Sequence, residues 1–129
     1  MDVRFDSDEL VGLFRDLASA QDRIRPGAAR AVRESAEDLR DDARARFAAQ
    51  RTTHKYLPHY GKSITAEMTG DDSAEVGPDK DLKQGAFGPG VEFGSVNKGP
   101  MPHLMPAADA VEPVLVERLL TAADSALRL

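Results

Sequence analysis

The chain has no cysteine and no tryptophan among its 129 residues. Without cysteine it has neither disulfide bonds nor thiolate metal ligands, and nothing points to an oxidising compartment. It also has no run of eighteen apolar residues, and residues 1–6 lack the basic start and apolar stretch of a signal peptide. We therefore expect a protein made in a cytoplasm, without insertion into a membrane.

The chain has fewer basic than acidic residues. Seventeen Lys and Arg residues face twenty-two Asp and Glu residues, which gives a net charge of -5. Proteins that bind duplex DNA neutralise its phosphates with clustered Lys and Arg. The acidic net charge disfavours such a surface. The composition, with 41% hydrophobic and 30% charged residues, is typical of one folded domain, here spanning 1–129.

The usual signatures of catalysis and metal binding are missing as well. His54 and His59 lie five residues apart without an HExxH pattern, and the third histidine is His103. The acidic loops lack the spacing of a calcium site, and neither a GxSxG elbow nor a GK[ST] phosphate loop is present. The sequence predicts no enzyme activity, no metal and no cofactor.

The N-terminal part of the chain has the spacing of amphipathic helices. A first helix is expected to begin near Ser7, and Pro26 is expected to end it. Its apolar residues should form one buried stripe. They are Leu10, Leu13, Phe14 and Leu17.

A second, longer helix is expected over residues 28–50, where apolar side chains recur every three or four residues. Oppositely charged residues four apart, such as Asp42 and Arg46, occupy its other side. That charged side is either a solvated surface or a contact between subunits. The sequence leaves both readings open.

The middle of the chain contains short strands and turns. Alternation over 63–68, a turn at 70–72 and the segment 74–76 predict an antiparallel hairpin. Residues 91–93 are expected to form another strand, and the proline-rich segment 99–106 a stiff extended connector.

Helical spacing returns beyond Pro106, so a C-terminal helix is expected, with a kink or a delayed start at Pro113. The fold class that follows is α+β. The N-terminal helices and the kinked C-terminal helix should pack on a small antiparallel sheet.

Four segments in fixed order carry a resemblance: YGKSIT at 60–65, VGPDKD at 76–81, VEFGS at 91–95 and PHLMPA at 102–107. In this order and spacing the chain resembles the siphophage tail-completion or neck-protein family. The resemblance implies a structural virion protein at the head-tail junction, assembled in the host bacterial cytoplasm. It implies an oligomeric ring, expected to be a hexamer, that contacts head-closure (stopper), tail terminator or tail tube proteins.

In that setting the acidic chain is expected to let DNA pass through the lumen without binding it specifically. Subunit contacts are expected from the loop after residue 93 and from the apolar, adaptable methionine cluster of the connector. The candidate interface residues are Glu92, Phe93, Gly94, Ser95, Val96, Asn97, Met101, His103, Leu104 and Met105.

Two other functions stay open from the sequence. One is a tail terminator that caps the tail tube, which has similar size and ring symmetry. The other is an intracellular binding module without a phage role, because small acidic helical domains occur there too. If Phe93 lies in the core, Phe93→Ala should destabilise the fold by roughly 3 to 5 kcal/mol.

Overall fold

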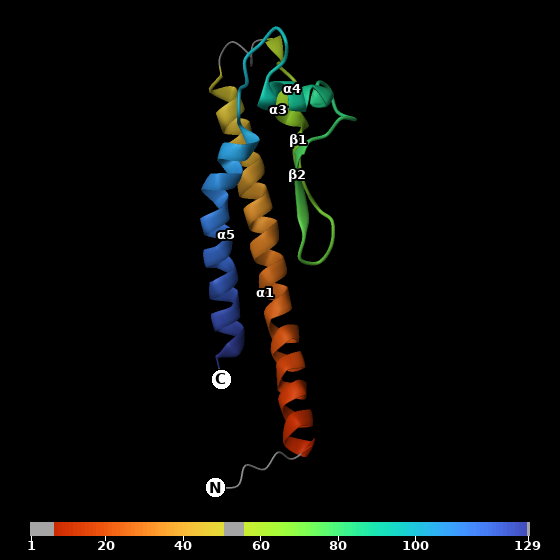
Figure 1. Cartoon of the computed structure of the whole chain (residues 1–129), viewed down its shortest axis with the longest axis vertical. Coiled ribbons are helices and arrows are strands. Elements are labelled where there is room, and N and C mark those ends of the chain that lie inside the picture. The colour runs from red at the N-terminus through yellow and green to blue at the C-terminus, as the bar shows by residue number, and fades with distance from the viewer. Residues whose placement is uncertain (1–6, 51–55, 129) are drawn as a thin grey trace.

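Two long helices lie side by side and run in opposite directions in the computed structural model of the chain (Figure 1). They are α1 (Ser7–Ala48) and α5 (Leu104–Leu127). The structure describes residues 7–50 and 56–128. The smaller elements gather at one end of the helix pair, and the hairpin lies along α1. The combination of helices with one two-stranded antiparallel sheet confirms the α+β class.

Helix α1 is continuous through Pro26, so the expected break between two helices was wrong. A proline inside a helix removes one hydrogen bond and commonly costs about 3 kcal/mol. The apolar positions nevertheless keep their phase across it, because Leu17, Ile24 and Ala31 are spaced by seven residues and so share one face. On the far side of Pro26, packing against α5 supports the helix, where Gly27 lies against Ala122.

The predicted hairpin is confirmed. Strand β1 (Ile64–Met68) pairs antiparallel with β2 (Ala74–Pro78), and Ala66 lies opposite Val76. Arg44 ties this sheet to α1, because its guanidinium donates to the carbonyl oxygen of Ile64 over 2.9 Å from Nε and 2.6 Å from Nη2. These hydrogen bonds hold the sheet against α1.

The strand expected at 91–93 was wrong, because these residues end helix α4 (Gly88–Phe93). Alternation over three residues cannot distinguish a strand from one helical turn. Pro89 favours the helix, because it occupies the first turn, where a missing N–H costs no hydrogen bond. Gly88 meets a packing requirement, since a Cβ atom there would come within 2.3 Å of Pro78 Cγ. The helical turn directs Val91 and Glu92 inward and leaves Phe93 outside.

Helix α5 begins at Leu104, inside the segment expected to be an extended connector, and it runs unbroken past Pro113. The expected delay at Pro113 was therefore wrong. Pro106 fits the first helical turn, where a backbone N–H has no helical acceptor in any case. The last residues of the proline-rich segment thus start the helix that they were expected to precede.

The main cluster of buried apolar residues is small and lies at the end where the short elements meet, namely α3 (Tyr60–Ser63), the 3-10 turn η1 (Gly85–Phe87) and α4. Its members are Ala43, Phe47, Tyr60, Ile64, Val91 and Ala107. The chain exposes 9333 Å² of surface, against about 6,700 Å² for a compact monomer of 14.0 kDa. Several large apolar side chains of α1 and α5 are accordingly not covered by any other element in residues 7–50 and 56–128.

Candidate assembly surface

A buried carboxylate joins α4 to the start of α5. Glu92 is 4% exposed and accepts three backbone hydrogen bonds. Its Oε2 accepts from the amide of His103 over 2.8 Å, and its Oε1 accepts from Leu104 over 2.7 Å and from Met105 over 3.2 Å. The amides at a helix start have no helical partner, and the positive end of the helix dipole favours an anion there. Glu92 therefore caps α5 from a separate helix.

His103 continues this polar cluster into the core. Its Nδ1 lies 3.0 Å from the carbonyl oxygen of Met101, which can only accept, so we assign the proton to Nδ1. Nε2 is then the acceptor for the Tyr60 hydroxyl, 2.7 Å away. Burial raises the pKa of Tyr60 above its ordinary value, and the negative charge of Glu92 adds to that shift.

Tyr60, Ser63, Glu92 and His103 form a closed cluster. None of the four is more than 4% exposed, and Ser63 donates to the carbonyl oxygen of Tyr60 over 2.6 Å. In the described part of the chain, no buried side-chain nitrogen or oxygen lacks a hydrogen-bond partner. The cluster has no open position for a substrate, and its geometry suits holding α3, α4 and α5 together.

The ten candidate interface residues divide by exposure. Phe93 is 73% exposed and Met105 58%, and Val96 is fully exposed at the tip of a tight turn with Ser95 and Asn97. Gly94, Met101 and Leu104 are partly buried. Glu92 and His103 belong to the interior, because the capping bonds draw them there. In a single copy of the chain, these two side chains are buried and therefore inaccessible to a partner protein.

The turn between Phe93 and Met101 is rigidly built. Gly94 has a φ of +85°, which favours glycine, and Ser95 and Lys98 exchange two backbone hydrogen bonds of 2.8 and 3.3 Å. Met101 donates to the carbonyl oxygen of Val91 over 2.8 Å, which closes the turn onto α4. Val96 is therefore presented outward on a fixed support.

The first turns of α1 carry exposed apolar side chains that the sequence predicted to be buried. Leu13 is 54% exposed, Phe14 68% and Leu17 58%. The side chain of Leu10, the fourth member of the expected stripe, lies outside the described residues. The prediction was wrong for the other three because α5 is much shorter than α1 and ends before it reaches them.

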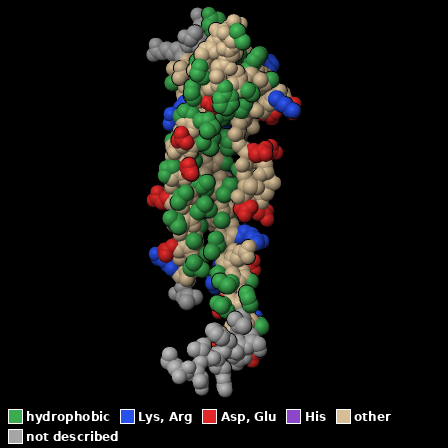
Figure 2. All heavy atoms as spheres, in the orientation of Figure 1, with side chains coloured by type: hydrophobic (Ala, Val, Ile, Leu, Met, Phe, Trp, Pro, Cys, Tyr) green, Lys and Arg blue, Asp and Glu red, His purple; other side chains and the backbone are tan. Residues whose placement is uncertain are grey.

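Helix α5 has a second exposed apolar row. Val116 is 49% exposed, Leu120 66% and Leu127 50%, whereas Val111 of the same helix is buried. In the space-filling view, hydrophobic side chains gather in a band along both helices (Figure 2). A monomer rarely leaves so much apolar surface in contact with water unless that surface binds something.

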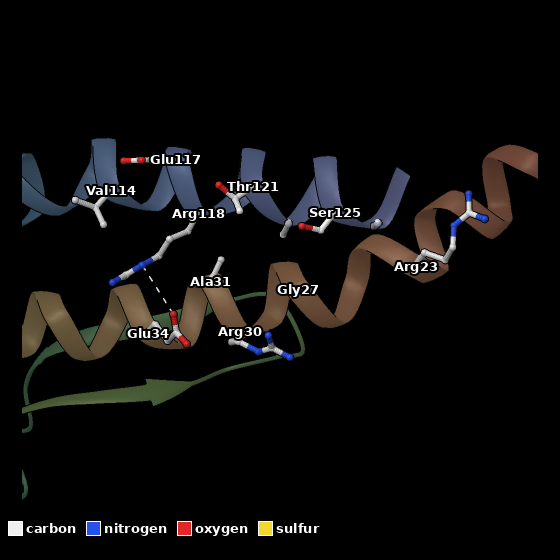
Figure 3. Close-up of a pocket in the computed structure, with 12 residues that line it drawn as sticks. Arg23, Gly27, Arg30, Ala31, Glu34, Val114, Glu117, Arg118, Thr121 and Ser125 are labelled. Atoms are coloured by element: carbon white, nitrogen blue, oxygen red, sulfur yellow. Dashed lines mark ion pairs between the residues drawn. The ribbon is translucent and has the colours of Figure 1, made fainter. Parts of the chain in front are cut away.

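Between the two helices lies an open groove of about 640 Å³, drawn in Figure 3. Arg118 reaches from α5 across its floor to α1. Its Nη2 is 2.7 Å from Asp38, its Nη1 donates to the Ser35 hydroxyl over 3.0 Å, and its Nε is 3.9 Å from Glu34. On the exposed side of α1, the expected pair of Asp42 and Arg46 is formed. The groove therefore runs along the contact between α1 and α5, and the ion pairs of Arg118 with α1 hold the two helices together there.

Neither a metal centre nor a membrane span was found in residues 7–50 and 56–128. No three His, Asp or Glu side chains there lie close enough together to hold a metal ion. His54 lies outside the described residues, and His59 is exposed. No described helix is long and apolar enough to cross a membrane.

Comparison with known proteins gives no relative: no family model, no curated protein and no solved structure matches the chain.

Proposed function

We propose that this chain is a structural assembly protein of a long-tailed phage, working as a ring of identical copies at the head-tail junction. In this role it completes the tail or joins the tail tube to the head-closing complex, and it catalyses no reaction. The observation that carries the proposal is an elongated chain with exposed apolar rows on two helices. Contiguous exposed apolar surface of this kind commonly marks a site of contact with another protein.

The segments that carry the family resemblance support the proposal because they work as one physical unit. Glu92 of the VEFGS segment binds the amides that begin α5 in the PHLMPA segment. His103 of the second segment reaches Tyr60 of the YGKSIT segment. Three of the four segments are therefore in direct contact with one another in the folded chain.

The negative charge of the chain also fits a ring around DNA. A net charge of -5 repels the phosphate backbone, and repulsion favours a duplex that slides through without being held. The proposal expects no specific DNA binding. A tail terminator has the same general requirements, so the layer of the neck is a matter for experiment.

The deciding experiment uses virions of the phage that encodes the chain. Antibody labelling and mass spectrometry of purified particles should find the protein, and immunogold labels should sit where the head meets the tail. Native mass spectrometry of the purified chain alone should give multiples of 14.0 kDa, with six as the expected number. Absence of the protein from virions would refute the proposed function.

A further inference from the structure

The hairpin of β1 and β2 has a free edge along β2. Asp79 donates its backbone N–H to Ser63 over 2.7 Å and Thr69 donates to Ser73 over 2.9 Å, so the odd-numbered positions form the ladder between the two strands. The even-numbered residues of β2 therefore turn their backbone groups away from β1. Within residues 7–50 and 56–128, those groups make no hydrogen bond to another part of the chain. An edge of this kind can pair with one more strand.

An apolar groove runs along this free edge. Its floor is α1, its walls are α5 and β2, and its volume is about 310 Å³. Most of its lining is apolar, including Val32 and Leu39 of α1, Val76 of β2, and Val111 and Leu115 of α5. A third strand beside β2 would lie over α1 in this groove, and every second side chain of that strand would point into it.

The outer face of the hairpin carries two acidic side chains without a cation. Glu67 of β1 lies directly opposite Glu75 of β2, and both are exposed. Among the residues that the structure describes, neither has an ion-pair partner. Like charges directly opposite each other destabilise a sheet. A third strand with a basic side chain beside Glu75 would offset that repulsion.

Residues 1–6, called the arm below, have the sequence that such a strand requires. In MDVRFD, apolar Met1, Val3 and Phe5 alternate with charged Asp2, Arg4 and Asp6. In an extended conformation, one face of the arm is therefore apolar and the other is charged, with Arg4 at its centre. The arm itself lies outside the described residues.

The arm is too short to reach the groove of its own chain. Helix α1 is continuous from Ser7, so Val32 on the groove floor lies about 37 Å along the helix from the end of the arm. Six fully extended residues span at most about 22 Å. An arm that enters this groove must therefore come from a second copy of the chain.

We propose that the arm of one copy pairs with β2 of a neighbouring copy as an antiparallel third strand, with Val3 opposite Val76. The inference rests on the proposed ring function and names a contact that links one copy to the next. Phe5 then lies opposite Ala74, and both arm side chains enter the groove, because directly opposite residues share one face of a sheet. Arm and edge are different surfaces, so the contact can pass from copy to copy and close into a ring.

Charge sets the register of this pairing. With Val3 opposite Val76, Arg4 lies opposite Glu75 on the outer face. A shift of two residues either way brings Asp2 or Asp6 opposite Glu75, and a shift of one residue turns the apolar side chains outward. In the antiparallel direction the arm leaves the sheet at the hairpin turn, and Figure 1 shows no other described element beyond that turn on this side of α1.

Disulfide trapping tests the pairing, because the chain has no cysteine of its own. Arg4→Cys and Glu75→Cys are made as separate full-length proteins, one of them isotopically labelled, and mixed in a glutathione redox buffer. Positions 4 and 75 would form a non-hydrogen-bonded pair with Cα atoms about 4.5 Å apart, which a disulfide can bridge. Mass spectrometry should find a linked species with one copy of each variant. The doubly substituted chain should give a ladder on denaturing gels.

Glu37→Cys is the matched control, because it removes the same charge from an exposed position on α1. It should not link to Arg4→Cys. A charge exchange tests the pairing without a covalent bond. Arg4→Glu should raise the concentration at which native assemblies dissociate by roughly fivefold, since it adds a negative charge beside Glu67 and Glu75. Combining it with Glu75→Arg should restore the original value.

Three results would overturn the arm contact. Arg4→Cys that links only to itself would show that arms pair with one another, and a mixture of folded variants without a mixed disulfide would show that the arm does not reach β2. Equal linking to Glu37→Cys would show that the arm has no fixed position. These failures differ from failure of the proposed function, which is decided on virions. A chain found at the head-tail junction without the mixed disulfide keeps the function and loses the arm contact.

Discussion

Glu92 holds the start of α5 through the backbone amide of His103, which donates to Oε2 over 2.8 Å, eleven residues along the chain. The capping group of a helix normally comes from the residue next to its first turn. Here the residue at that position, His103, makes no side-chain cap, and a carboxylate from α4 takes over. The position of α5 is thereby coupled to the turn between the two helices.

Replacing this carboxylate by an amide tests that coupling. In Glu92→Gln, one of the two side-chain oxygens becomes an NH₂ group, which faces a backbone N–H whichever way it is turned. We expect a loss of roughly 1.5 to 3 kcal/mol in the free energy of unfolding, the range for a hydrogen bond to a charged group. Urea denaturation followed by circular dichroism measures it. Glu37→Gln, on the exposed face of α1, is the control and should change stability by less than about 0.5 kcal/mol.

The Tyr60 hydroxyl should make stability depend on alkaline pH. Burial and the charge of Glu92 raise its folded pKa above the unfolded value, so the stabilisation is complete below about pH 10 and is lost as pH rises toward the folded pKa. Tyr60→Phe should cost about 1 to 3 kcal/mol at pH 7, because His103 loses the donor to its Nε2. The stability difference between wild type and variant should shrink between pH 10 and pH 11. A constant difference over that interval would contradict the assignment.

The two described glycines inside α1 should respond differently to substitution by alanine. Gly12 has open space at the position of a Cβ atom, so Gly12→Ala should raise helicity and stability by up to about 1 kcal/mol. At Gly27 a Cβ atom would lie 2.9 Å from the Cβ of Ala122, so the same gain in propensity is offset by pushing α5 away. We expect Gly27→Ala to be neutral or destabilising. Thermal and urea unfolding of both variants check the sign, and equal gains would mean that the helices do not pack closely there.

Replacing Phe47 by alanine should cost far more stability than replacing Phe93. Phe47 is 1% exposed and packs against Tyr60 with ring centroids 4.6 Å apart, so Phe47→Ala should cost about 3 to 5 kcal/mol. Phe93 is 73% exposed, so the condition attached to the sequence-based estimate fails and Phe93→Ala should cost less than about 1 kcal/mol. Melting temperatures of the isolated chain compare the two. A large loss at Phe93 in assembled material only would identify it as a contact between subunits.

The local elements of this protein follow from its sequence where the pattern is long. Helical spacing over 28–50 and beyond Pro106, and strand alternation over 63–68, correspond to α1, α5 and β1. The prediction failed where it relied on single residues or very short patterns. Pro26 did not end a helix, and the three residues 91–93 formed a helical turn.

The candidate site was predicted only in part for a related reason. The sequence predicted the candidate residues between 92 and 105 as one interface. Which of them are buried and which are exposed depends on how α4 and α5 are oriented. Glu92 and His103 turned inward, while Phe93 and Met105 stayed outside. The exposure of the apolar row in the first turns of α1 was not predicted, because periodicity reports that a helix has an apolar face and says nothing about whether another element reaches it.

Sequence alone determined the acidic balance, the absence of cysteine and the apolar faces of the helices, since these are properties of composition and spacing. Only the tertiary structure decided which of those faces are covered. That outcome depends on the lengths of α1 and α5 and on the level at which Gly27 meets Ala122. Burial is a relation between distant segments, so the uncovered length of α1 becomes visible only when the two helices lie side by side.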